Sequence, residues 1–373
     1  MNGITRIVMN SFDHPITPSE RPAVDGNFFN NIGAYKKLRG IVYGQLDPTS
    51  VHNSIITDLY LALCNRNGMI EYLMDFYSLK PINQSRGNHK IFFEVNNRGQ
   101  KLFNKFAQVL GGNKPTTAND VKQAYTIVWS GWNPSITSTG DPNLLRIYLP
   151  IAKNIDSTSI TDPVYQYIVF DNPTSTSYMN SYDTNSIDTR TGFAATRYFV
   201  SFLRSKRYDN PLAEDITRVI SWNLSQPARY MNDFLWLGFN QDTQEKQVFD
   251  GIFNWIGAGN GIGLNYRFAQ LKRTECNRQN HLYPEATFPF TYTILHDPLT
   301  GKIDGRNARS GSLMHSNLRD NDPSDLSSVR YYLISGTRHS DPSQPNTREI
   351  CQQFGRTIDP NPILRALFVA LDQ

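Results

Sequence analysis

The middle of the chain alternates between helical and extended patterns, and this alternation constrains the fold more than any other feature. Apolar residues fall at helical spacing over 194–204, a β-branched run covers 216–220, and a second helical pattern covers 228–237. Parallel strands need a crossover connection, usually a helix. The helix–strand–helix order therefore predicts an α/β fold with a mainly parallel central sheet flanked by helices.

Further strands and helices are predicted on both sides of this unit. The expected strands share alternating or fully apolar patterns and cover 40–44, 70–76, 90–95, 125–129, 144–149, 164–170 and 329–334. Helical spacing occurs over 102–110 and over 362–371, where proline lies in the first turn. No repeat or long linker interrupts the chain, so we expect a single domain over 1–373, with a β-rich N-terminal portion at 1–85 and its core at 86–373.

The composition is that of a globular protein. With 373 residues, 39% of them hydrophobic, the chain can bury a large core. The net charge is only +4, and the densest basic cluster, 204–207, lies at the end of a helical pattern, where cations suit the helix dipole. A nucleic-acid partner is therefore not expected.

Cysteines and apolar segments bear on the compartment. Three cysteines are too few for a disulfide framework, and an odd number fits a reducing compartment. The first residues do not form a signal-peptide pattern, and no run of about 18 apolar residues occurs. We expect a soluble, cytoplasmic protein without a membrane partner, with secretion after removal of a signal sequence as the alternative. The oligomeric state is left open.

One serine, Ser225, lies between the predicted strand 216–220 and the predicted helix 228–237. A nucleophilic serine needs a sharp strand-to-helix turn, because the turn exposes its oxygen while backbone N–H groups point at the developing oxyanion. The positions two before and two after such a serine are usually small, but here they are Asn223 and Pro227. Asparagine tolerates unusual backbone angles and proline fits a first helical turn. The competing interpretation is a serine that only caps the helix.

A base for this serine would be a histidine after a late strand. His339 follows the predicted strand 329–334 and lies downstream of Ser225, which is the order expected of a nucleophile and base on this architecture. The alternative is a solvated loop histidine. Of the 7 histidines, His339 is the best placed.

Two further patterns are weak signals. The glycine-rich stretch 257–263 has no G-x-G-x-x-G register and no following Lys-Ser/Thr, so it predicts a loop turning close to the sheet rather than a dinucleotide site. His281, His296 and His315 lack paired spacing and companion carboxylates. We therefore expect neither a cofactor nor a metal.

Ten ordered blocks, spread over nearly the whole chain, resemble one family. The blocks are GAYKKLRGIVYGQLDP (33–48), FFEVNNRGQK (92–101), AYTIVWSGW (124–132), ATRYFVSFLR (195–204), SWNLSQPARYMNDFLWLGFN (221–240), NYRFAQLKRT (265–274), HLYPEATFPFTY (281–292), DPLTGKIDG (297–305), YYLISGTRH (331–339) and NPILRALFVALD (361–372). They resemble the bacterial α/β-hydrolase-domain family of predicted esterases, whose nucleophile turn, or elbow, reads G-x-S-Q-S-G-R. The resemblance implies an α/β-hydrolase fold and serine-dependent acyl hydrolysis.

The resemblance also assigns site residues. The elbow's Ser, Gln and Arg correspond to Ser225, Gln226 and Arg229, and the strand-end histidine corresponds to His339. In such folds the oxyanion is bound by the N–H after the nucleophile and by one from an earlier loop. These donors would be Gln226 and the turn formed by Asn97, Arg98 and Gly99.

The sequence departs from the family in two places. The elbow's glycine before the serine is Asn223, and the Ser-Gly after the glutamine is Pro227-Ala228. Near residue 310 the chain lacks a segment that family members carry, one that would supply a strand and the acid of the triad. Asp304 is the substitute we nominate, with Asp325 as a second choice.

The sequence thus predicts a serine hydrolase that cleaves a small-molecule carboxylic ester or amide through an acyl-enzyme on Ser225, with His339 as general base. The alternative is a catalytically impaired relative that binds an apolar or acyl ligand without turnover. The aromatic run 288–292, with Trp129 and Trp132, indicates either an apolar pocket or core packing.

Overall fold

The computed structural model describes part of the chain, and the statements below concern that part. The described residues are 3–9, 32–102, 124–134, 136, 144–161, 191–213, 216–257, 262, 264–265, 295–296, 303–304, 327–335, 337 and 358–373.

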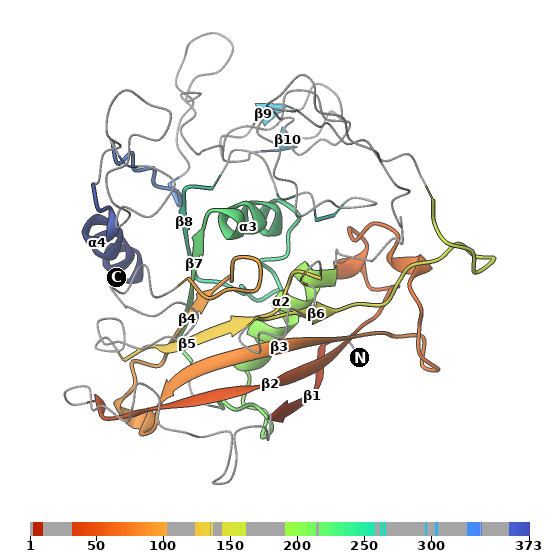
Figure 1. Ribbon diagram of the computed structural model, residues 1–373, viewed down its shortest axis with the longest axis horizontal. Helices are drawn as coiled ribbons and strands as arrows, with labels where there is room; N and C mark the ends of the chain where they lie inside the picture. The colour runs from red at the N-terminus through yellow and green to blue at the C-terminus, as the bar shows by residue number, and fades with distance from the viewer. Residues whose placement is uncertain are drawn as a thin grey trace, which may run out of the picture.

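An eight-stranded mixed sheet organises these residues (Figure 1), in the order β1-β2-β3-β5-β4-β7-β8 with β6 paired to β3. Its strands are β1 (Gly3–Met9), β2 (Tyr35–Leu46), β3 (Ile70–Pro81), β4 (Lys90–Glu94), β5 (Thr126–Ser130), β6 (Ile147–Tyr148), β7 (Arg218–Leu224) and β8 (Gly251–Trp255). A separate two-stranded sheet pairs β9 (Leu295–His296) with β10 (Ile303–Asp304). The helices are α2 (Thr191–Leu203), α3 (Gln226–Trp236) and α4 (Asn361–Asp372), with short 3₁₀ turns η3 (Val51–Asn53), η4 (Leu59–Leu61) and η5 (Gln84–Arg86).

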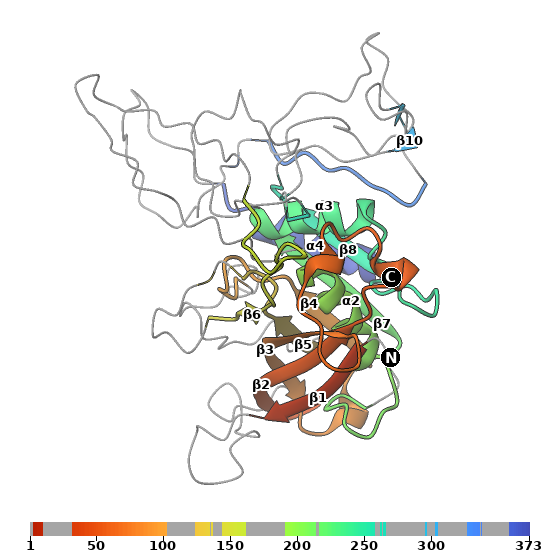
Figure 2. The ribbon, with the colours of Figure 1, turned by 90° about the vertical axis from the view of Figure 1, so that its right-hand side faces the viewer.

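The sheet divides into an antiparallel and a parallel half. Strands β1, β2, β3 and β5 are antiparallel neighbours, and Figure 2 shows the first three side by side. Strands β5, β4, β7 and β8 are parallel neighbours. The expected α/β-hydrolase fold, with a sheet flanked by helices and a β-rich N-terminal part, is confirmed.

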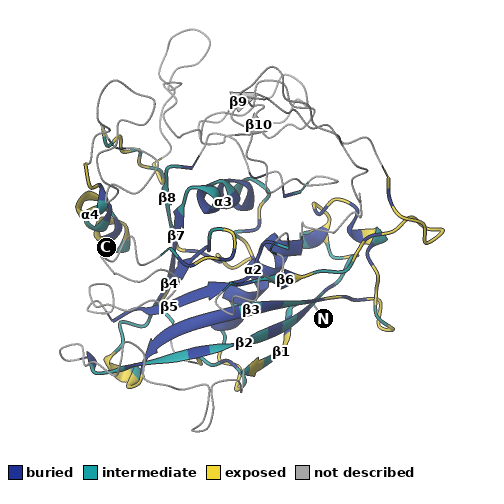
Figure 3. Cartoon of the chain, viewed as in Figure 1, coloured by how far each residue is buried: buried dark blue, intermediate teal, exposed yellow. Residues whose placement is uncertain are grey.

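Helices cover both faces of the parallel half. Helices α2 and α3 lie on one side of β7 and β8, and α4 lies on the other (Figure 1). Because both faces are covered, β5 is buried along its whole length and β4 at all but its first residue (Figure 3). Their apolar runs, 90–95 and 125–129, are the sequence signature of this burial.

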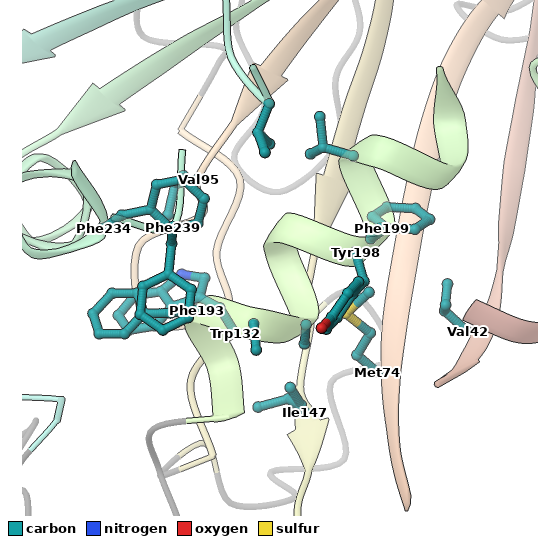
Figure 4. Close-up of a cluster of buried hydrophobic side chains, with 14 of the residues drawn as sticks. Val42, Met74, Val95, Trp132, Ile147, Phe193, Tyr198, Phe199, Phe234 and Phe239 are labelled. Carbon is teal, nitrogen blue, oxygen red and sulfur yellow. The ribbon is translucent and has the colours of Figure 1, made fainter. Parts of the chain in front are cut away.

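The core between α2, α3 and the sheet is rich in aromatic rings (Figure 4). The ring of Tyr230 lies 4.5 Å from that of Trp132 and 4.6 Å from that of Phe193, centroid to centroid. Trp129 and Trp132 are both fully buried. These two tryptophans therefore belong to the core and not to an open pocket; the run 288–292 lies outside the described residues.

Three element predictions need correction or extension. The strand predicted at 216–220 is β7, which continues to Leu224, so Ser225 follows the strand directly rather than five residues later. No strand forms over 329–334, where Tyr332 and Leu333 are 59% and 84% exposed, because strand propensity depends on packing against neighbouring strands. The strands β1 and β8 were not predicted. The predicted strand 164–170 and nearly all of the predicted helix 102–110 lie outside the described residues.

None of the helices in the described ranges is both long and apolar enough to cross a lipid bilayer.

Candidate functional site

The turn between β7 and α3 bends at a single residue, Ser225. The backbone N–H of Ser225 donates to the carbonyl of Trp255 on β8 at 3.0 Å, so strand pairing continues up to the serine. Its carbonyl then accepts the N–H groups of Ala228 and Arg229 at 3.0 and 3.3 Å, which starts the helix. One residue thus ends the strand and begins the helix.

This sharp bend places Ser225 in a strained backbone conformation. Its φ is 67° and its ψ is −115°. A positive φ is uncommon for residues with a Cβ, and this ψ also lies far from the left-handed helical region, where most such residues are found. Ser225 is the N-cap residue of α3, but its side chain makes no capping hydrogen bond to the helix, so a side-chain cap does not explain this conformation.

The residues around Ser225 explain how the turn forms without flanking glycines. Pro227 lies in the first turn of α3, where its missing N–H costs nothing. Ala228 is fully buried against Gly257, and a Cβ at Gly257 would lie 2.6 Å from the Ala228 Cβ. The close approach thus occurs between α3 and the end of β8, at the first residue of the predicted glycine-rich loop 257–263.

The turn lies at the edge of the sheet where ligands bind in open α/β folds. Strands β4 and β7 are parallel, with Glu94 paired to Trp222, so their carboxyl ends meet at one edge. The chain leaves β4 toward β5 on one side and leaves β7 toward β8 on the other, which makes this the topological switch point of the sheet. The loop after β4 and the turn at Ser225 form the two sides of this position.

The side chain of Asn96 holds the loop after β4. Its Nδ2 donates to the carbonyl of Ser130 at 2.6 Å, and its Oδ1 accepts the N–H of Gly99 at 2.9 Å. Its carbonyl accepts the indole N–H of Trp132 at 2.8 Å. The loop is thereby fixed to the end of β5 and is preorganised rather than loose.

The predicted oxyanion residues form a tight turn in this loop. The N–H groups of Asn97 and Gln100 donate to each other's carbonyls at 2.9 Å, and Arg98 and Gly99 both have positive φ, 51° and 80°. The N–H groups of Asn97 and Gly99 are therefore bonded within the loop. The Nδ2 of Asn97 donates to the carbonyl of Leu224 at 3.4 Å, which links the turn to the residue before Ser225.

The buried carboxylate of Glu94 also supports the loop after β4. Glu94, the last residue of β4, is 1% exposed. It accepts hydrogen bonds from the N–H of Leu102 and from the indole of Trp129. The sequence did not single out Glu94 or Asn96, although a polar residue at the end of a fully apolar strand is a signal of a buried hydrogen-bonding role.

The structure brings together only part of the predicted site. Ser225, Gln226 and Arg229 lie on the turn and on the first helical turn of α3, beside the loop that carries Asn97, Arg98 and Gly99. His339 and Asp325 lie outside the described residues. Asp304 is the last residue of β10, and its side chain is not described.

The other predicted histidines give no further information. His281 and His315 lie outside the described residues, and His296 is in β9 with an undescribed side chain. Elsewhere in the described ranges, no three His, Cys, Asp or Glu side chains come together in a way that could hold a metal ion.

The side chain of Tyr230, on α3, is uncharged. The hydroxyl of Tyr230 donates to the carbonyl of Gly192 at 3.0 Å and is hydrogen-bonded to the Thr196 hydroxyl at 2.9 Å. Complete burial raises the pKa of Tyr230 well above its usual value, and the hydrogen bond with Thr196 opposes this only in part. This tyrosine joins α3 to α2 and has no charge with which to act on Ser225.

A family model identifies the class of domain to which the chain belongs. Residues 171–366, just over half of the chain, match the family model described as "Alpha/beta hydrolase domain". This match includes β7, Ser225 and α3, but it is shorter than the predicted resemblance over nearly the whole chain. No curated protein matches the chain.

Two solved structures show limited similarity. Acetyl xylan esterase 1 from Thermoanaerobacterium sp. JW/SL YS485 is 10% identical over 62% of this chain and 48% of its own, with a TM-score of 0.27. A prohormone-processing carboxypeptidase from Saccharomyces cerevisiae is 12% identical over 58% of this chain and 38% of its own, also with a TM-score of 0.27. The chain thus spans less than half the length of either structure, and at these TM-scores neither similarity bears on its fold or function. On the family match, the chain belongs to the α/β hydrolase domain family.

Proposed function

We propose that the protein is a serine hydrolase that cleaves a small-molecule carboxylic ester or amide through an acyl-enzyme on Ser225. The observation that supports this most is the backbone of Ser225, with φ 67° and ψ −115° between β7 and α3. Strained backbone of this kind costs of order 1–3 kcal/mol and is typical of functional sites. A nucleophilic serine on a strained strand-to-helix turn is the arrangement that α/β hydrolases use.

The proposed reaction has two steps. The Ser225 Oγ attacks the substrate carbonyl carbon while His339 takes the hydroxyl proton, and this proton passes to the leaving alcohol or amine as its bond to the carbonyl breaks. Water then attacks the acyl-enzyme, giving its proton to His339, and the carboxylic acid leaves as Ser225 recovers its proton. Asp304 is the proposed partner of His339, and its carboxylate would orient the imidazole of that histidine.

Two backbone N–H groups are proposed to bind the oxyanion. One is the N–H of Gln226, at the start of α3, where the helix dipole adds to the effect. The other is the N–H of Arg98, since those of Asn97 and Gly99 are bonded within the loop. The fixed position of this loop would allow such a donor to act without reorganisation in the transition state.

The test uses labelling and turnover together. Wild-type protein should react with a fluorophosphonate at Ser225, located by mass spectrometry of the labelled peptide, and should hydrolyse p-nitrophenyl acetate or butyrate. The Ser225→Ala variant should lose the label and about 10⁴-fold or more of the rate, as expected when a triad nucleophile is removed. Ser205→Ala is the matched control, because the Ser205 hydroxyl donates to the local carbonyl of Phe202 at 2.6 Å and Ser205 lies just beyond the end of α2.

His339→Ala and Asp304→Asn test the remaining roles. Loss of either the base or its orienting acid should lower turnover by orders of magnitude while the protein stays folded. Unchanged turnover in Asp304→Asn would remove that residue from the proposal, and Asp325→Asn would then be measured in the same way.

The second candidate is an impaired relative that binds an acyl or apolar ligand without turnover. The observation in its favour is the elbow composition, with Asn223 and Pro227 where glycines are usual. Equal hydrolysis by wild type and Ser225→Ala, with no label on Ser225, would support this candidate and remove the first.

A further inference from the structure

Four polar side chains close to Ser225 form a continuous series of hydrogen bonds, called the ladder below: Ser221, Asn223, Asn254 and Asn232. The Ser221 Oγ donates to the Asn223 Oδ1 at 2.9 Å, and the Asn223 Nδ2 donates to the Asn254 Oδ1 at 3.0 Å. The Asn254 Nδ2 then donates to the Asn232 Oδ1 at 3.1 Å. Ser221 and Asn223 are fully buried, Asn232 is 6% exposed and Asn254 is partly buried, so most of this series is shielded from water.

The ladder joins the three elements that meet at the elbow. Ser221 and Asn223 lie on β7, Asn254 on β8, and Asn232 on the second turn of α3. Asn223 is also the residue opposite Asn254 in the parallel pairing. The bend at Ser225 therefore has side-chain bonds across it, from the strand before it to the helix after it.

We propose that Asn223, Asn254 and Asn232 are positioning residues that hold Ser225 in its strained conformation. A conformation that costs of order 1–3 kcal/mol persists only where the surrounding structure fixes it. In a strand-to-helix turn with glycine two residues before the serine, close backbone packing does this work. Here the side chain of Asn223 occupies that space, and its hydrogen bonds replace the packing.

The hydrogen bonds of the ladder resist movement of α3 relative to β7 and β8. Asn223 and Asn232 are buried, so breaking a link to either residue leaves a buried amide group without that partner. Any rotation of α3 relative to β7 and β8 would lengthen the bond between Asn254 and Asn232. The ladder thus opposes the motion that would relax the φ of Ser225.

The test replaces one link and compares it with a matched loss elsewhere. Asn232→Leu removes the acceptor of the Asn254 amide and keeps the branching and the number of heavy atoms of the side chain. Thr196→Val is the control: Thr196 is 1% exposed and is hydrogen-bonded to the Tyr230 hydroxyl at 2.9 Å, so the variant also removes one buried hydrogen bond of α3 but leaves the ladder intact. Asn254→Ala cuts the ladder at another link, which keeps the test decisive if Asn232→Leu does not fold.

Two readouts are measured on each variant. Hydrogen–deuterium exchange of the peptide containing residues 223–227 reports the bond from the Ser225 N–H to Trp255. The second readout is the fluorophosphonate reaction, resolved into a maximal rate and a half-saturating concentration, and it depends on the proposed serine mechanism. Both ladder variants should exchange about tenfold faster and label about tenfold more slowly at saturation, with the half-saturating concentration unchanged, as expected for one broken buried bond.

The outcomes separate this inference from the proposed function. Equal exchange in wild type and both ladder variants, or an equal acceleration in Thr196→Val, would overturn the positioning role. Absence of label on wild-type Ser225 would overturn the proposed function, while the exchange measurement would still decide whether the ladder holds the turn.

Discussion

Replacing Ser225 by glycine should stabilise the protein even as it removes the proposed nucleophile. The conformation φ 67°, ψ −115° is the mirror image of an ordinary extended one, which glycine adopts as readily as its counterpart. Relief of the strain should gain about 1–3 kcal/mol, and the extra freedom of glycine in the unfolded chain should cost about 0.5–1 kcal/mol. The net expectation is that Ser225→Gly is more stable than Ser225→Ala by about 1 kcal/mol, because alanine keeps the Cβ and the strain.

The measurement is the unfolding midpoint of both variants in urea and by calorimetry, with a matched pair at Ser50. Ser50 has an ordinary φ of −67° and ψ of 131° and also makes no side-chain capping bond. At that position glycine should be less stable than alanine, by about 0.5–1 kcal/mol. The reasoning about strain is refuted if glycine is the less stable residue at both positions.

Three further predictions concern the elbow's packing and two carboxyl groups, those of Asp75 and Asp47. Gly257→Ala should cost about 1–3 kcal/mol of stability, because the new Cβ would lie 2.6 Å from the Ala228 Cβ. The thermal midpoint should fall and labelling of Ser225 should slow. Adding Ala228→Gly should restore both values, and a failure of this rescue would contradict the assigned contact. Burial raises the pKa of Asp75, and hydrogen bonds and charge from Arg146 oppose it only in part. Because the folded pKa is above the unfolded one, wild-type stability should fall as pH rises through that interval, so Asp75→Asn should gain stability relative to wild type from acidic to neutral pH in urea titrations. Asp47→Asn should show the opposite sign, since hydrogen bonds from Thr49 lower the pKa of Asp47.

The sequence predicted β4 and β5 well because burial there has a simple signature. Strands β4 and β5 are covered on both faces, so their apolar runs are continuous and bounded. The same signature failed at 329–334, where Tyr332 and Leu333 are exposed, Ile334 is only partly buried and no strand forms. A local pattern reports what a segment could bury, and only the tertiary structure decides whether a neighbour is present to bury it.

The end of β7 shows a second limit of local patterns. The apolar run stops at Ile220, but the strand continues through Leu224 because Ser221 and Asn223 are paired inside the protein. In sequence, two polar residues after an apolar run indicate that the strand has ended. Asn223 bonds Asn254, which lies 31 residues further along the chain, and Asn254 in turn bonds Asn232 on α3, so no local window contains the reason for the burial of Asn223.

The two departures from the family elbow therefore have different physical weight. Pro227 replaces a residue whose N–H would have no partner within the helix, so it fits the first turn of α3 without compensation. Asn223 brings a polar group into a space where no water can reach it, and it is tolerated only because Ser221 and Asn254 bond it. By comparison with the elbow motif alone, both residues are simply mismatches. The contacts instead indicate that the first is neutral and the second requires a coordinated set of partners, and the strained backbone of Ser225 is held in place with those partners present.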